Sequence, residues 1–462
     1  MVEPSTQYRC TIITRGRAQG KKDDLLPAFA SVINTLCPCH KSVFDEAFDK
    51  EIIRKLSVEP KTAANYRTET AGQLFGMYYI DSSSIVHSGK RTEKLIGDND
   101  QPAFFKDVCY KLQVPSGINR VSQDKTLAYM QNNIRFRPCP FLLNLLRIAE
   151  TRRIVLTKKE IAYYALNSLE VLKGESSPVE ILEVIIRARR INSRAEQQLS
   201  GSRDLQHINE IFNLMYFANL IRIEGQNITI NSRESTTIEA MVESLTEPLP
   251  FDVYQYDLST VESRKIFRRE WSEYYAALSD KGGSVFDTSV ESLVEDISEV
   301  YVSPEEMESN IGDEGERWVY FREKERVKAF NERLARNVLH VGAQPGLGYD
   351  VQSVIAGLPG NSEHKMYIEV KTTKRVTAIT EPWKDQIKLE TSQWIAAEQL
   401  RTSFWIFRVY WTNERSRRLF RINDPYDKYQ KGLIHVAPIG FRVEFKNDSG
   451  EFFDYGNGNE EE

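Results

Sequence analysis

An acid and a base alternate in the segment MYIEVKTTK, residues 366–374, which otherwise has the composition of a β-strand. Because strand side chains alternate between two faces, Glu369 and Lys371 are predicted to share one face. Ile368 and Val370 then point the other way. The segment alone favours an exposed ion pair, worth about 0.2–1 kcal/mol, over a small site in which a carboxylate and an ammonium act together.

A second carboxylate changes that balance. Asp350 begins a predicted strand after the glycine-rich turn in GLGYDVQSV, and Glu369-Val370-Lys371 follows nineteen residues later. This is the spacing of the PD-(D/E)XK nucleases, although Tyr349 stands at the proline position. Phosphodiester hydrolysis needs a divalent metal, and Mg²⁺ prefers oxygen ligands, which we expect from Asp350, Glu369 and the Val370 carbonyl. Lys371 is expected to orient or deprotonate the attacking water and to offset charge on the phosphate.

A third acid is expected from the helix predicted at GERWVYFREKERVKAFNERLA. Glu316 and Glu323 are seven residues apart and so lie on one helical face. We expect Glu316 first and Glu323 second to join the site, although either could bond a neighbouring Lys or Arg instead. His340, on the following strand, is expected to be structural. On a later helix, Gln393 could support the site or its core, and Trp394 is expected in the core.

The C-terminal half reads as a helix, three strands, a second helix and further strands, an α/β order that begins with a meander. The strands are predicted at NVLHV, YDVQSVIAG, KMYIEVKTT, FWIFRVYW and RLFRI, and the second helix at TSQWIAAEQLR. Thr391 or Ser392 is expected to cap that helix. From Asp287 to Glu316 the chain has eleven acids and no Lys or Arg, which is typical of a solvated connector.

Two hairpins stand out in the N-terminal half. Each consists of a predicted strand, at 77–80 and at 220–223, a polar turn and a second strand, from Ser84 and at 227–231. Each follows several predicted helices, and Thr157 with Glu160 begins one of them in capping-box spacing, as Ser177 with Glu180 begins another. Helices closed by a hairpin indicate a winged-helix module. An unspecialised α+β domain is the alternative.

Charge is unevenly distributed along the 462 residues, although the net charge is only −5. Residues 1–240 have 33 Lys and Arg against 27 Asp and Glu, whereas residues 241–462 have 28 against 39. A basic N-terminal half is suited to a polyanion. The expected phosphate contacts are Arg187, Arg189, Arg190, Lys158 and Lys159, for which a solvated basic face is an equal alternative.

Four sequence blocks resemble the NO VEIN C-terminal nuclease-like domain, a PD-(D/E)XK relative found in restriction and DNA-defence proteins. They are GDEGERWVYFREKERV, GLGYDVQS, YIEVKTTK and TSQWIAAEQ…FWIFRVY, within residues 305–440. The resemblance implies Glu316, Asp350, Glu369 and Lys371 as the site. The segment RPCPFLLNLLRIAETRRIVLTKKEIAYYAL resembles, more loosely, the tandem winged-helix recognition regions of AlwI-type restriction endonucleases.

The expected fold class is multidomain α+β. Two winged-helix-like modules are expected at 1–125 and 126–245, a helical and acidic connector at 246–304 and an α/β PD-(D/E)XK domain at 305–462. No apolar run is long enough to span a membrane and the five cysteines are scattered, so a cytoplasmic protein without a disulfide framework is expected.

These features predict a type II-like restriction endonuclease that cleaves double-stranded DNA with Mg²⁺, with a homodimer left open as the form that cuts both strands. The alternatives are a methylation-dependent endonuclease and a non-catalytic DNA-binding regulator with a decayed nuclease domain. Retention of Glu316, Asp350, Glu369 and Lys371 argues against decay, because clustered charges are costly to keep in a site without a use.

Overall fold

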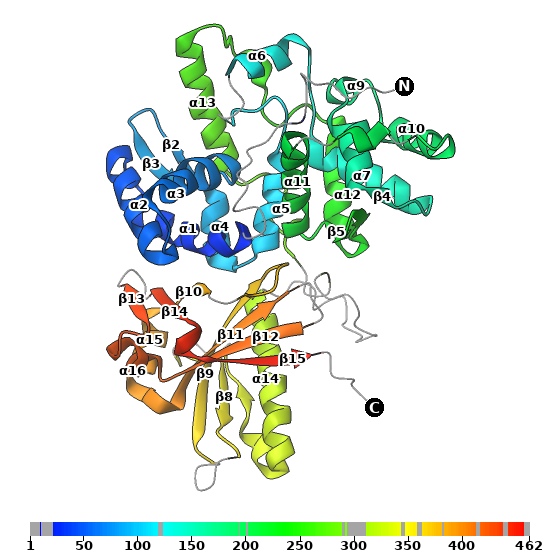
Figure 1. Ribbon diagram of the computed structural model, residues 1–462. Helices are drawn as coiled ribbons and strands as arrows, with labels where there is room; N and C mark the ends of the chain where they lie inside the picture. Colours follow the sequence, from blue (N-terminus) through cyan, green and yellow to red (C-terminus); the bar gives the residue numbers. More distant parts are fainter. Residues whose placement is uncertain are drawn as a thin grey trace. The chain divides into compact units, whose positions relative to one another are not determined.

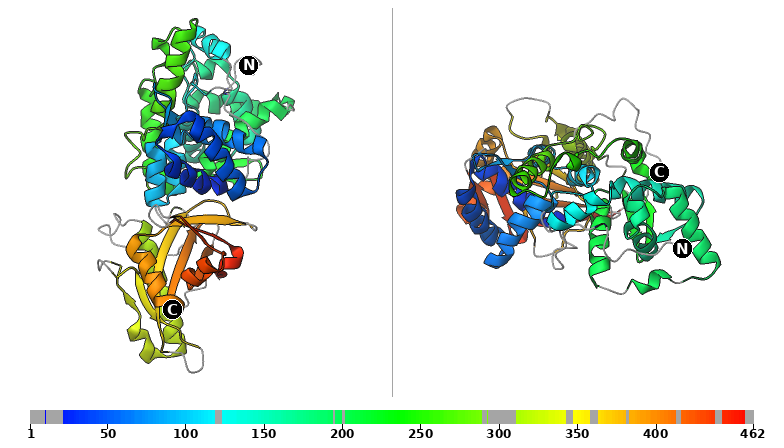
Figure 2. Two further views of the ribbon diagram at one scale, coloured as in Figure 1. Left: turned by 90° about the vertical axis from the view of Figure 1, so that its left-hand side faces the viewer. Right: turned by 90° about the horizontal axis from the view of Figure 1, so that it is seen from above.

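The computed structural model forms two compact units, one of Met1–Ile96 with Gln101–Thr288 and one of Gly97–Asp100 with Ser289–Glu462 (Figure 1). The described residues are Cys10, 22–118, 123–193, 195–199, 202–288, 292, 311–342, 347–357, 363–380, 383–412, 416–437 and 442–456. The first unit is mainly helical and the second is built around a sheet (Figure 2).

The first unit begins with helices that are closed by a hairpin. Its elements are α1 (Lys22–Leu36), β1 (Cys39–His40), α2 (Lys41–Leu56), α3 (Pro60–Asn65), the π-helix η1 (Tyr66–Leu74), β2 (Tyr78–Ile80) and β3 (Ile85–Ser88). Phe44, Phe48 and Ile52 recur every fourth residue and bury one face of α2, which packs against α1. The strands form an antiparallel sheet in the order β1-β3-β2, so the first predicted hairpin is confirmed.

The same order recurs later in the first unit. The elements are α7 (Pro138–Thr151), β4 (Leu156–Thr157), α8 (Lys158–Ile161), η2 (Ala162–Leu166), α9 (Leu169–Leu172), α10 (Pro178–Arg190), α11 (Ser202–Phe217), β5 (Ile221–Glu224) and β6 (Asn227–Ile230). The sheet order is β4-β6-β5, which matches that of the first hairpin strand for strand. Both predicted capping boxes are present, Thr157 with Glu160 and Ser177 with Glu180.

Five further α-helices complete the described part of the first unit. They are α4 (Lys90–Asp98), α5 (Gln101–Lys111), α6 (Gln123–Gln131), α12 (Ser235–Glu243) and α13 (Val261–Ala276). Lys106 Nζ on α5 lies 2.8 Å from Glu234 Oε2, and both groups are buried. Helix α13 packs against β2, and the Tyr275 hydroxyl donates a hydrogen bond to the Leu74 carbonyl at 3.0 Å. Residues 246–288 of the expected connector therefore lie inside the first unit, and most of 289–304 lies outside the described residues.

A six-stranded mixed sheet organises the second unit, in the order β15-β12-β11-β9-β8-β7. Its strands are β7 (Leu339–His340), β8 (Val351–Val354), β9 (Lys365–Lys374), β11 (Phe404–Trp411), β12 (Ser416–Asn423) and β15 (Glu451–Gly456). Strands β7, β8 and β9 form the predicted antiparallel meander. Strands β9 and β11 pair in parallel, which requires a long connection between them. That connection holds helix α15 (Thr391–Leu400).

Helix α14 (Ile311–Phe330) packs against β8 and β9. Its Gly315 lies so close to the sheet that an added Cβ would be 1.7 Å from Thr372 Oγ1. A second apolar core joins the sheet to α15, to α16 (Pro425–Gln430) and to a small sheet of β10 (Lys384–Lys388), β13 (His435–Ala437) and β14 (Arg442–Lys446). Trp394 is buried in that core, as expected.

The cap of α15 differs from the predicted one. Glu390, and neither Thr391 nor Ser392, is the N-cap residue, and its amide donates a hydrogen bond to Gln393 Oε1 at 2.7 Å. The side chain three residues into the helix thus satisfies the free amide of the N-cap residue, as in a capping box. Gln393 therefore completes the cap. Among the described residues no helix has the length and apolar character needed to cross a membrane.

Candidate active site

Glu369 and Lys371 form a close ion pair on the central strand β9. Lys371 Nζ lies 2.7 Å from Glu369 Oε1, and the Glu369 side chain is only 1% exposed. Ile406 and Arg408 of β11 pair with these two residues, so all four point to one face of the sheet. The predicted sharing of one face is confirmed, with the carboxylate buried and the Lys371 side chain 21% exposed.

Asp350 is attached to the same strand by two hydrogen bonds. Its amide donates to the Ile368 carbonyl at 2.9 Å, and its Oδ2 accepts from the Val370 amide at 2.7 Å. The carboxylate is thus fixed against the residue that separates Glu369 from Lys371. This contact brings together the two parts of the motif, which are nineteen residues apart in the sequence.

Glu316 reaches the same group of residues from α14. Its Oε2 lies 3.0 Å from His340 Nε2 on β7. A Cβ added to Gly342 would be 2.2 Å from Glu316 Oε2 and 3.4 Å from Asp350 Oδ1, so the glycine leaves the room in which the two carboxylates approach each other. Glu316, Asp350 and Glu369 form the acidic cluster of the site.

Burial raises the pKa of all three acids of the cluster, and the neighbouring carboxylates raise those of Glu369 and Glu316 further. Burial and the charges of Asp350 and Glu316 raise the pKa of Glu369 to about 8, against the opposing effect of Lys371. Burial also raises the pKa of Asp350, and burial together with the Asp350 charge raises that of Glu316. Burial lowers the pKa of Lys371, but Glu369 and Asp350 raise it more, so it stays above its usual value. The cluster therefore favours a bound cation, which would relieve the repulsion.

Glu323 lies apart from the acidic cluster. Its carboxylate contacts Arg326 at 2.6 Å and accepts a hydrogen bond from the Ser353 hydroxyl at 2.6 Å. Arg326 also donates to the carbonyl oxygens of Val354 and Ile355, at 2.6 and 2.8 Å. These contacts attach α14 to the end of β8. Of the two possibilities that the sequence leaves open for Glu323, the structure therefore shows the bond to a neighbouring arginine.

Three residues near the acidic cluster were not among the predicted site residues. The sequence predicts a structural role for His340 and indicates no role for Gly342 or Glu390. Glu390 is close enough to Lys371 for its charge to raise the pKa of the lysine. The signal that could have pointed to Glu390 is its place three residues before Gln393, which is capping-box spacing. No local pattern indicates His340 or Gly342, because both reach the site through tertiary contacts.

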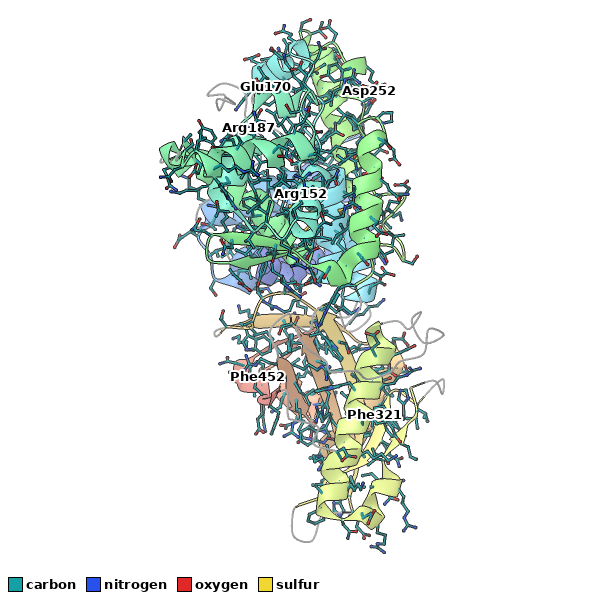
Figure 3. All side chains as sticks on the ribbon, turned by 90° about the vertical axis from the view of Figure 1, so that its right-hand side faces the viewer. Arg152, Glu170, Arg187, Asp252, Phe321 and Phe452 are labelled. Atoms are coloured by element: carbon teal, nitrogen blue, oxygen red, sulfur yellow. The ribbon has the colours of Figure 1, made fainter. Side chains whose placement is uncertain are left out.

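The predicted phosphate-contacting residues of the first unit divide into two groups. Arg189 is bound within the unit, with Nε 2.7 Å from Glu160 Oε1 and a hydrogen bond to the Val155 carbonyl. Lys159 Nζ donates a hydrogen bond to Gln197 Oε1 at 2.9 Å, and partial burial lowers the pKa of Lys158. Arg187 and Arg190 are exposed on α10, where Figure 3 labels Arg187.

Comparison with known protein families assigns both parts of the chain. The family described as restriction endonuclease BpuJI, N-terminal, matches residues 3–272. The chain belongs to this family. The family described as protein NO VEIN, C-terminal, matches residues 315–422, a range that contains Glu316, Asp350, Glu369 and Lys371. The predicted resemblances to a restriction-enzyme recognition region and to the NO VEIN domain are therefore confirmed, with BpuJI as the matched restriction enzyme.

A solved structure supports the assignment of the first unit. It is described as the crystal structure of pyrene- and phenanthrene-modified DNA in complex with the BpuJ1 endonuclease binding domain. The sequences are 39% identical, the TM-score is 0.55, and the match covers 59% of this chain and 98% of the other. None of the curated proteins compared with the chain matches it.

Proposed function

We propose that the protein is a type II-like restriction endonuclease that binds double-stranded DNA through its first unit and hydrolyses it in its second. The observation that carries the proposal is the acidic cluster beside Lys371, which lies within the region matched by the NO VEIN family. Family membership of the first unit with BpuJI, whose binding domain was solved with DNA, supports the division of roles.

The strand order of the first unit supports the proposal that it consists of two winged-helix modules. In both halves a short strand after the first helix pairs with the second strand of the hairpin, and further helices precede the hairpin. Winged-helix modules read DNA by placing one helix in the major groove, while basic side chains contact phosphates. Arg187 and Arg190 are exposed on α10, whereas Arg189, which is also exposed, is held by Glu160.

The acidic cluster supplies the oxygen ligands that Mg²⁺ prefers. Glu369 is buried and its Oε2 has no hydrogen-bond donor among the described groups, which suits a carboxylate intended for a cation. Asp350, Glu369, Glu316 and the Val370 carbonyl would hold the ion. The described residues contain no ready-made group of three His, Cys, Asp or Glu metal ligands, and Lys371 Nζ lies against the Glu369 oxygen in this arrangement. The lysine thus partly neutralises Glu369.

Lys371 is the cationic group held beside the acidic cluster, and its raised pKa keeps it protonated. When bound, Mg²⁺ would polarise the scissile phosphate and lower the pKa of the attacking water. Lys371 Nζ, held 2.7 Å from Glu369, can orient that water and offset the charge that develops on the phosphate oxygens. Asp350, fixed by the Val370 amide, keeps the ligand set against the strand that carries the lysine.

Digestion of methylated and unmethylated plasmids, each with Mg²⁺ and with EDTA, tests the proposal. We expect Mg²⁺-dependent cleavage of the unmethylated plasmid by the wild type and none by Asp350→Ala. Cleavage of only the methylated plasmid would select the methylation-dependent alternative. DNA binding without cleavage of either plasmid would select the non-catalytic regulator.

A further inference from the structure

The end of strand β7 forms a wall of the site that the motif residues do not include. His340 pairs with Val351 of β8 through the main chain, and its Nε2 lies 3.0 Å from Glu316 Oε2. The next amide, that of Val341, donates a hydrogen bond to the Asp350 carbonyl at 2.7 Å. The backbone on both sides of the imidazole is therefore attached to β8 and Asp350, and His340 reaches from it to α14.

Gly342 explains why Glu316 needs a partner in this position. The absence of a Cβ at residue 342 lets the Glu316 and Asp350 carboxylates approach each other, and two like charges in a partly buried space repel. The Glu316 side chain is 17% exposed and lies on the second turn of α14, so it could turn toward solvent. The contact with His340 opposes that movement.

We infer that His340 is a positioning residue, which holds the Glu316 carboxylate beside Asp350 and so completes the ligand set of the metal site. This inference rests on the proposed function. A neutral imidazole donates from one ring nitrogen, and a carboxylate partner selects the tautomer with the proton on Nε2. Donation to Oε2 of Glu316 leaves Oε1 for a cation.

A role in the apolar core does not account for the position of His340. Its side chain is 31% exposed, and the aromatic ring beside it is that of Tyr320, with centroids 6.1 Å apart. Tyr320 lies one turn after Glu316 on α14, so the imidazole is held between two residues of the same helix. Groups that orient metal ligands in this way typically change metal affinity about 10–100-fold when they are removed.

Mn²⁺ binding to the full-length protein, measured by electron paramagnetic resonance without DNA, tests the inference. His340→Leu should weaken Mn²⁺ binding about 10–100-fold, and His340→Gln, whose amide can still donate, should recover most of the loss. The matched control is His364→Leu, which removes an exposed histidine of the same unit and should leave the affinity unchanged.

A double-mutant cycle separates action through Glu316 from a direct role. If His340 acts through Glu316, the double variant His340→Leu, Glu316→Gln should bind Mn²⁺ no more weakly than Glu316→Gln alone. Additive losses, or an unchanged affinity in His340→Leu, would overturn the inference. Circular dichroism checks that each variant is folded, and the Gln variant and the cycle remain informative if the Leu variant alone is destabilised.

Asp350→Ala, measured in parallel, distinguishes failure of this inference from failure of the proposed function. If Asp350→Ala binds Mn²⁺ as tightly as the wild type, the proposed metal site is itself wrong. If Asp350→Ala loses Mn²⁺ affinity but His340→Leu does not, the metal site is supported and only the proposed role of His340 is wrong.

Discussion

Oδ2 of Asp350 accepts a hydrogen bond from the main-chain amide of Val370 at 2.7 Å. One backbone group thereby sets the position of a carboxylate relative to Glu369 and Lys371, which flank it on β9. Asp350 consequently has two roles in the structure, as an acceptor that ties the end of one strand to the next and as a charge in the acidic cluster. Substitutions can separate these roles.

Asp350→Asn should abolish cleavage while keeping the tie to Val370, because an amide oxygen accepts a hydrogen bond but is a poor Mg²⁺ ligand. Asp350→Ala should also be inactive, and in addition it leaves a buried amide without an acceptor, which costs about 1–3 kcal/mol. Urea unfolding and plasmid cleavage of the two variants provide the comparison. An Asn variant that cuts at nearly the wild-type rate would exclude Asp350 from the metal site.

Glu369→Gln should change how stability depends on pH. Because the folded state raises the pKa of Glu369 to about 8, it binds a proton that the unfolded state has lost above about 4.5. The wild-type free energy of unfolding should therefore fall relative to that of Glu369→Gln as the pH rises from about 4.5 to 8, by at most about 1.4 kcal/mol per pH unit. Urea unfolding in EDTA at several pH values measures the difference, and parallel curves would contradict it.

Lys371→Ala should slow cleavage by roughly 10²–10⁴-fold, the range assigned to one acid–base group. DNA affinity in Ca²⁺ should stay close to that of the wild type, because this lysine is proposed to act on the water and the phosphate rather than on bases. Lys365→Ala, at the exposed start of the same strand, is the matched control. Equal cleavage rates for Lys371→Ala and Lys365→Ala would show that Lys371 has no part in the reaction.

Gly342→Ala should displace the Glu316 carboxylate, since the new Cβ would lie 2.2 Å from its Oε2. We expect weaker Mn²⁺ binding and slower cleavage, with the fold retained. Gly283→Ala is a suitable control, because a Cβ there meets no atom within 4 Å. Calorimetric titration with Mn²⁺ gives the affinities, and a Gly342→Ala variant that binds as well as the control would show that the space at residue 342 is not needed.

Arg187→Ala and Arg190→Ala should weaken DNA binding and reduce its dependence on salt, because each phosphate contact adds roughly 0.9 to the slope of log K against log salt. Arg189→Ala should instead lower stability, since it breaks the ion pair with Glu160. Gel-shift titrations at several salt concentrations, with thermal unfolding, distinguish the two effects. An unchanged salt slope in both exposed-arginine variants would place the phosphate contacts elsewhere.

Local periodicity was sufficient to predict the elements that hold the acidic cluster. Period-two alternation in residues 366–374 put Glu369 and Lys371 on one face, and the apolar spacing after Glu316 predicted α14. Alternation and turn residues likewise predicted both hairpins. These features depend on neighbours in the sequence, so the sequence carries their signal directly.

Tertiary contacts, which the sequence does not reveal, determine which acid of α14 joins the acidic cluster. Glu316 and Glu323 share a helical face, but Arg326 and Ser353 bind Glu323, whereas His340 and the gap at Gly342 receive Glu316. Helical spacing cannot distinguish the two acids, because the difference arises from which strand lies opposite each turn. The two-residue strands β1 and β4 are likewise too short for any periodic pattern and are defined only by their pairing with the hairpins.

The assignment of Gly97–Asp100 to the second unit has a consequence for protein engineering. The Thr373 hydroxyl donates to the Asn99 carbonyl at 2.8 Å, and Asp100 forms a parallel bridge with Lys374 at the end of β9. Cutting the chain after Thr288, or replacing residues 1–288 in a gene fusion, would separate these four residues from the strand that carries Glu369 and Lys371. A chimera intended to join the proposed nuclease domain to a new recognition region should therefore retain residues 97–100 of the present chain as well as its C-terminal portion.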